Sequence, residues 1–254
     1  FIASRGVILD SLMPFGLVFV GGCSATFLPS VALGAFVGYF IPAIGSGGFR
    51  YIAALLGVVA IRLILSNYNK ICESFIFLGT ISTLANAVTG IVSYSGVPVN
   101  AVKLVAECIL TFGGVFVVSR SFYCIAQEQS GFTVDSLVCL LASATILIIG
   151  ISDFLLFGLS IGNIVGVFLI LVSAKYGGVT ASSACGIALS FASAITRSFE
   201  AGFGVYAFAG LAAGIFLSLG KYAQSLSVIA SGIIGLSFVQ FKDGSAAFLT
   251  EIII

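Results

Sequence analysis

The chain contains no histidine and no tryptophan, and only 7% of its 254 residues are charged. Soluble domains carry about 25% charged residues. Because 60% of the residues here are hydrophobic, so few charges could not cover the surface of a soluble folded domain. The same hydrophobic content excludes an intrinsically disordered chain. The composition therefore predicts an integral membrane protein.

The missing histidine removes the commonest metal ligand and the commonest acid–base catalyst. The six cysteines are scattered, without the close pairs that metal sites require. The four aspartates fall in four different segments, and the sequence has neither a phosphate-binding glycine loop nor a nucleophile elbow. We therefore expect no enzymatic activity, no metal and no cofactor in this chain.

Positive charge is also scarce, since ten Lys and Arg residues leave a net charge of +1. This gives no basic field for nucleic acid and no polybasic strip for anionic lipid. With a cytoplasmic N-terminus, five of these residues fall in the predicted inner connections and five in the outer ones. Because the split is even, the positive-inside rule gives no orientation.

Long apolar runs dominate the sequence instead. A bilayer core about 30 Å thick requires roughly 20 apolar residues per helix. By this measure the chain divides ten times, at charged or turn residues such as Pro29 and the glycine-rich segment 45–48. The predicted spans are 11–28, 29–45, 50–66, 71–93, 98–119, 133–150, 153–173, 178–196, 203–219 and 222–240.

The apolar runs are continuous and do not alternate with polar residues, which favours helices over a β-barrel. They leave only about 50 residues for connections and ends, so no soluble domain fits between them. We predict one all-α, polytopic membrane domain of about ten spans over residues 1–254. The polar segment 119–131 is either a short interfacial helix or a plain loop.

Glycine accounts for 31 residues, well above its usual share of about 7%. Glycines spaced four apart form a groove on one helix face and let backbones approach closely. The spaced glycines are Gly34 with Gly38, Gly158 with Gly162 and Gly166, and Gly210 with Gly214. Such grooves serve either self-association or packing within one bundle. We favour packing within the bundle, because glycine is frequent in membrane helices generally.

Ionisable residues inside membrane spans are functional candidates. Lys103 and Glu107 lie four apart in one predicted span, and Arg197 and Glu200 lie three apart at a helix end. Most charged residues stand near predicted helix ends, where snorkelling or capping explains them. Glu107 lies deepest, and we interpret it either as a structural partner of Lys103 or as an ion or substrate ligand.

Three stretches, taken in order, resemble the membrane domain of the stage II sporulation protein E family. In the first, 4–22, the matching residues include Arg5, Pro14, Phe15 and Gly16, whereas Ser4, Gly6 and Met13 depart from the family pattern. In the second, 175–191, Gly177, Gly178 and Gly186 match, but Ala181 and Ser183 stand where the family has glycine. In the third, 232–251, the matching residues are Lys242, Gly244 and Ser245.

The resemblance implies a longer protein in which a cytoplasmic linker and a metal-dependent serine/threonine phosphatase follow residue 254. It implies that this phosphatase activates the forespore sigma factor, and that the linker contacts a tubulin-like division protein. It also places the protein in the cell membrane, enriched at the asymmetric division septum. The catalytic residues would then lie outside this chain, and its partners would be the lipid bilayer and further copies of itself.

Two alternatives remain open at the level of sequence. The Lys103 and Glu107 pair and the glycine-broken helices are also typical of a secondary transporter or small-solute permease. The glycine grooves are also typical of a membrane module that binds other membrane proteins. A membrane anchor performs no chemistry, so it differs from a transporter in needing no central ligand site.

Overall fold

The computed structural model describes residues 1–7, 12–43, 48–65, 74–94, 98–126, 134–152, 154–156, 159–195 and 204–237. These residues are helical apart from short connections and one antiparallel pairing of two-residue strands. The chain divides into two compact units. Unit 1 comprises Phe1–Gly6 and Ser11–Phe132, and unit 2 comprises Val7–Asp10 and Thr133–Ile254.

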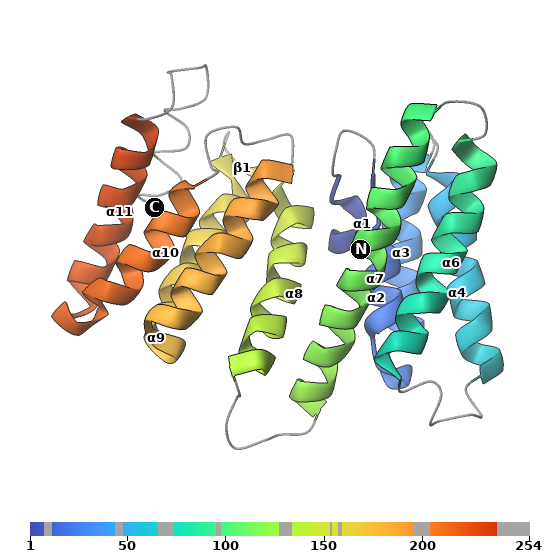
Figure 1. The fold of residues 1–254 in the computed structure, drawn as a ribbon, viewed down its shortest axis with the longest axis horizontal. Coiled ribbons are helices and arrows are strands. Elements are labelled where there is room, and N and C mark those ends of the chain that lie inside the picture. The colour runs from blue at the N-terminus through green and yellow to red at the C-terminus, as the bar shows by residue number, and fades with distance from the viewer. Residues whose placement is uncertain are drawn as a thin grey trace. The chain divides into compact units, whose positions relative to one another are not determined.

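Unit 1 is built around a short buried helix. Its elements are α1 (Ile2–Arg5), α2 (Phe15–Gly22), the 3-10 turn η1 (Ala25–Phe27), α3 (Leu28–Ala43), α4 (Phe49–Ile64), α6 (Phe75–Tyr94) and α7 (Pro98–Ala126) (Figure 1). Helix α2 contacts α1, α3, α4, α6 and α7. Every residue of α2 except Phe19 is buried. This eight-residue helix is therefore the centre of the unit.

Arg62, at the end of α4, closes the buried C-terminus of α2. The last carbonyls of a helix have no partner within the helix and need donors from elsewhere. The Arg62 guanidinium donates to the carbonyl oxygens of Val20 at 2.6 Å and Cys23 at 2.8 Å, with a longer contact of 3.3 Å to Gly21. Arg62 is itself buried, with 6% of its surface exposed.

Glycine lets α2 approach α7 closely. A Cβ atom on Gly22 would lie 2.8 Å from Val118 of α7, and one on Gly114 of α7 would lie 2.9 Å from Val18 of α2. A Cβ atom on Gly38 of α3 would likewise collide with Ser4 of α1. Any larger side chain at these positions would force the helices apart. Packing inside unit 1 thus uses glycines from three different helices.

Unit 2 consists of α8 (Val134–Ser152), β1 (Leu155–Leu156), β2 (Leu159–Ser160), α9 (Ile161–Ile195), α10 (Val205–Ile215), the 3-10 turn η3 (Phe216–Leu219) and α11 (Lys221–Ser237). Helix α9 reverses direction at Gly178, whose φ of 66° and ψ of −154° favour glycine. The reversal brings Leu189 within 3.4 Å of a Cβ built on Gly166. Figure 1 shows the two arms of α9 running in opposite directions.

The second arm of α9 packs against α10 through small residues. A Cβ on Gly186 would lie 2.3 Å from the Tyr206 carbonyl oxygen, and a Cβ on Gly210 would lie 2.3 Å from that of Ser182. Gly214 meets Ser182 Oγ and Val179 at similarly short range. At these helix crossings, backbone faces backbone. The apolar core of unit 2 includes this seam and extends to α8, the first arm of α9 and α11.

Three described helical segments, Phe75–Ser93, Ala101–Ala126 and Ile161–Ala194, are long and apolar enough to cross a membrane. Because the last one reverses at Gly178, each of its arms has about 17 residues and reaches about 26 Å. Each of the ten predicted spans contains helix, but ten crossings remain a prediction. Helix α7 continues to Ala126, so the first part of 119–131 is neither a separate helix nor a loop.

Replacing Arg62 tests its role at the end of α2. We expect Arg62→Met to lower the free energy of unfolding by about 2 kcal/mol, because buried carbonyls lose their donors. The midpoint of thermal unfolding in detergent should fall by about 4–8 °C. Lys221→Gln, at an exposed position of unit 2, is the control and should leave the midpoint unchanged. Equal midpoints for the two variants would contradict the capping role.

Two glycine substitutions test the close packing of α9 and α10. Gly210→Ala should destabilise the chain by about 1–3 kcal/mol, because its Cβ would meet the Ser182 backbone oxygen. Gly113→Ala is the matched control, since a Cβ on Gly113 of α7 meets nothing within 4 Å. The control should stabilise the chain slightly, because alanine is the better helix former. Thermal unfolding of both purified variants measures the difference.

Candidate functional site: a buried polar network in unit 1

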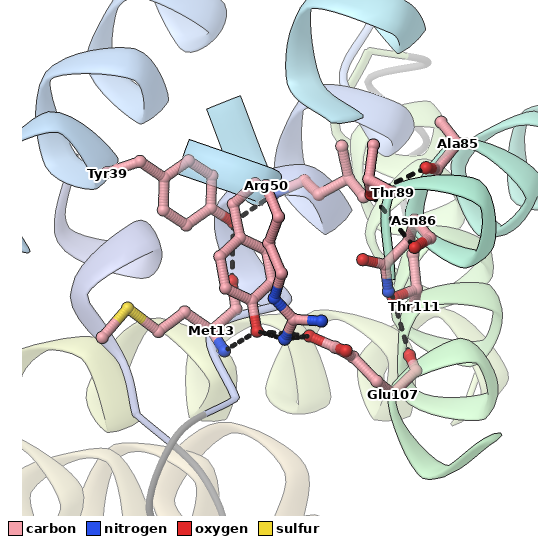
Figure 2. Close-up of polar contacts among 10 residues, drawn as sticks. Met13, Tyr39, Arg50, Ala85, Asn86, Thr89, Glu107 and Thr111 are labelled. Atoms are coloured by element: carbon pink, nitrogen blue, oxygen red, sulfur yellow. Dashed lines mark hydrogen bonds and ion pairs between the residues drawn. The ribbon is translucent and has the colours of Figure 1, made fainter. Parts of the chain in front are cut away.

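The strongest concentration of buried polar groups in the described part of unit 1 lies where the start of α4 meets α7. Arg50 Nη2 lies 2.9 Å from Glu107 Oε1, and the two side chains are 7% and 0% exposed. Arg50 also lies over the Tyr51 ring, 4.3 Å from its centroid. The Tyr51 hydroxyl donates to Glu107 Oε1 and accepts from Arg50 Nη2 (Figure 2).

Two tyrosines connect this ion pair to the backbone before α2. The Met13 N–H donates to the Tyr51 hydroxyl at 2.9 Å, and the Tyr39 hydroxyl donates to the Met13 carbonyl oxygen at 2.7 Å. The Tyr39 hydroxyl also accepts from the N–H of Leu17, in the first turn of α2, at 2.9 Å. The two rings stack with centroids 5.3 Å apart. Side chains therefore satisfy an irregular backbone where no helix supplies partners.

The polar groups continue along the seam between α6 and α7. Asn86 Nδ2 donates to Thr111 Oγ1 at 3.2 Å, and Thr111 Oγ1 donates to the Glu107 carbonyl oxygen at 2.7 Å. Three buried side-chain atoms here have no hydrogen-bond partner among the described residues, namely Ser82 Oγ, Asn86 Oδ1 and Glu107 Oε2. In Figure 2 the Asn86 amide oxygen points away from Thr111. The seam can therefore still accept hydrogen bonds.

The electrostatics of the site are those of a buried, compensated pair. Removing either partner would leave a charge without its counter-charge in an apolar interior, which is far more costly than removing both. Because the Tyr51 hydroxyl and Arg50 both reach Oε1, the carboxylate is fixed in place. The described network has no nucleophile–base pair, so its chemistry is to hold structure and to accept hydrogen bonds.

The structure changes our interpretation of the ionisable residues. The partner of Glu107 is Arg50, from a different helix, whereas the sequence had suggested Lys103, one turn earlier on α7. Lys103 is partly exposed. Arg197 and Glu200 lie outside the described residues. Glu107 therefore forms its ion pair with an arginine of α4.

The glycines and family-motif residues fall into several groups. For five of the spaced or motif glycines, a built Cβ would lie less than 3 Å from an atom of a neighbouring helix: Gly38, Gly162, Gly186, Gly210 and Gly214. A Cβ on Gly34 would lie 3.1 Å from the Phe1 backbone nitrogen, and one on Gly166 would lie 3.4 Å from Leu189. Gly177 and Gly178 form the reversal of α9. Pro14, Phe15 and Gly16 form the start of α2, and Arg5 ends α1. Gly158, Lys242, Gly244 and Ser245 lie outside the described residues.

The sequence analysis missed four residues that organise unit 1, namely Tyr39, Arg50, Tyr51 and Arg62. We had counted both arginines only as charges near span ends. Their intervals to their partners, 57 residues from Arg50 to Glu107 and 42 from Arg62 to Val20, follow no helical period. A partial signal was present, because three apolar residues follow Arg62 before the apolar run ends, and a charge inside such a run requires a partner.

Taken together, the fold and the site define a helical protein whose apolar helices fit a membrane location and whose buried Arg50 and Glu107 form an ion pair. Comparison with protein families then identifies the family of the chain. The family model described as SpoIIE, N-terminal domain, matches residues 1–253, so the chain belongs to this family. This confirms the resemblance drawn from the three motifs. No curated protein and no solved structure matches the chain.

The family assignment also bears on catalysis. The matching region is the N-terminal domain of the family, which does not include the phosphatase domain, and it spans essentially the whole chain. The buried network of unit 1 therefore lies in the N-terminal domain that defines the family.

A double-mutant cycle tests the Arg50–Glu107 pair. Glu107→Gln should lower the free energy of unfolding by about 3 kcal/mol, because it leaves the buried guanidinium without its counter-charge. Arg50→Met alone should cost a similar amount, because it leaves the buried carboxylate unpaired, and Arg50→Met combined with Glu107→Gln should cost less than either single change. Thermal or denaturant unfolding in detergent measures each variant. Lys103→Gln, one turn away on α7, serves as the control, and additive single effects would contradict the pair.

Proposed function

We propose that this chain is the multi-pass membrane domain that holds a sporulation serine/threonine phosphatase at the cell membrane. The observation that carries the proposal is the family match over residues 1–253. The low charge and the apolar helices support it. In this proposal the membrane domain performs no chemistry. The parent protein would act at the asymmetric septum, where its phosphatase activates the forespore sigma factor.

The mechanism of such a domain is positional. Tethering a catalytic domain to a membrane raises its effective concentration toward other tethered molecules without any new contact. Self-association of the membrane domain would strengthen this effect by bringing catalytic domains together. A linker after the membrane domain would then be the segment that contacts the tubulin-like division protein. Each of these roles requires a rigid, correctly folded bundle, which the buried network of unit 1 provides.

The proposal predicts where the chain goes in a cell. We expect residues 1–254 fused to a fluorescent protein to sediment with membranes and to concentrate at the polar septum of a sporulating cell. Glu107→Gln should reduce the amount of folded fusion protein, while Gly113→Ala should leave it unchanged. A fusion that stays uniformly in the cytoplasm would contradict the anchor, and uniform membrane fluorescence would contradict septal enrichment.

One observation favours a transporter as the second candidate. Glu107 is fully buried beside the irregular backbone before α2, and transporters place ion and substrate groups at such breaks. The presence of Arg50 next to Glu107 weighs against a cation ligand, because the pair is already neutral. Thermal stabilisation of the purified chain by one solute among a panel of ions and small molecules would favour the transporter.

A further inference from the structure

The sequence contains two Lys-Tyr dipeptides in unit 2, Lys175-Tyr176 and Lys221-Tyr222, separated by 44 residues. Lys175 Nζ lies 5.4 Å from the centroid of the Tyr176 ring, and Lys221 Nζ lies 5.1 Å from that of Tyr222. The two tyrosines are 78% and 81% exposed, and both lysines are exposed as well. Each dipeptide stands beside a chain reversal that a positive-φ glycine makes, Gly178 in one case and Gly220 in the other.

The fold brings the two dipeptides to the same end of unit 2. Gln224 Nε2 of α11 donates to the Leu171 carbonyl oxygen of α9 at 2.9 Å. Lys175 follows Leu171 by one helical turn, and Lys221 precedes Gln224 by slightly less than one turn. Both lysines therefore lie about one turn beyond a shared hydrogen bond, toward the same end. In Figure 1 the reversal of α9 and the start of α11 lie at one end of this unit.

The surroundings of the lysines resemble a membrane–water interface. Among the side chains that the structure describes in unit 2, Lys175 and Lys221 are the charged ones. Large apolar side chains are exposed beside them: Val179, Ile215, Phe216 and Leu219. Lysine and tyrosine next to an apolar collar are the usual residues at the headgroup level of a bilayer.

We propose that Lys175 and Lys221 together bind the phosphate of an acidic phospholipid, with Tyr176 and Tyr222 at the headgroup level and the apolar collar against the acyl chains. We call the surface formed by these two lysines and two tyrosines the Lys-Tyr end. Lysine binds phosphate as a mobile point charge, and its long stem allows two ammonium groups to converge on one phosphate. The inference rests on the membrane location within the proposed function and assigns a lipid class to one surface.

The test measures lipid binding to the purified 254-residue chain by native mass spectrometry. Phosphatidylglycerol and phosphatidylcholine are titrated separately in detergent. We expect the wild-type chain to bind phosphatidylglycerol about tenfold more tightly, and Lys175→Gln combined with Lys221→Gln to lose about that factor. Lys175→Arg combined with Lys221→Arg should keep the preference, because arginine also binds phosphate. Phosphatidylcholine binding should not change.

Three controls make the outcome decisive. Lys103→Gln removes a positive charge in unit 1 and should retain the wild-type lipid preference. Equal thermal midpoints for the wild-type and Gln variants show that folding is intact, since the lysines are exposed. Competition by millimolar inorganic phosphate would identify a free-anion site and overturn the lipid assignment. Equal phosphatidylglycerol affinity in wild type and double Gln variant would overturn the site and leave the anchor function untouched.

Discussion

The constraint on which unit 1 depends is that every buried backbone polar group must find a partner in an apolar interior. Helix α2 is buried, so the polar groups at its ends are shielded from water and neighbouring helices supply their partners instead. Arg62 supplies donors to the terminal carbonyls, and Tyr39 and Tyr51 bond the backbone at Met13. Because these bonds come from α3 and α4, the central helix fixes the positions of the helices that surround it. The Arg50–Glu107 pair then ties α4 to α7.

Unit 2 meets the same constraint in a different way. Its helices approach so closely that backbone packs against backbone, with Gly186 and Gly210 at the crossing of α9 and α10. Few charges are needed, because the helices satisfy their own backbone groups and small residues provide the contact. Where α9 reverses, Gly178 adopts a backbone conformation that other residues rarely take. The charged side chains that the structure describes in this unit lie beyond the apolar core, at one end.

These two arrangements are consistent with a domain whose function is position. Arg50 and Glu107, buried in unit 1, are paired with each other, and a buried pair of that kind resists change. An anchor benefits from such rigidity, whereas a transporter would need an element with two states. The Lys-Tyr end of unit 2 would add a lipid contact to the hydrophobic anchoring.

The helical class, the approximate helix positions and the family follow from the amino-acid sequence, because hydrophobic run length and motif order are local properties. The sequence also indicates Glu107 as a deeply placed charge. The fold was needed to show that the partner of Glu107 is Arg50, that Arg62 caps α2, and that Lys175 and Lys221 lie at one end. The physical reason is that such partners come from different helices, and no periodicity along the chain encodes which helices become neighbours.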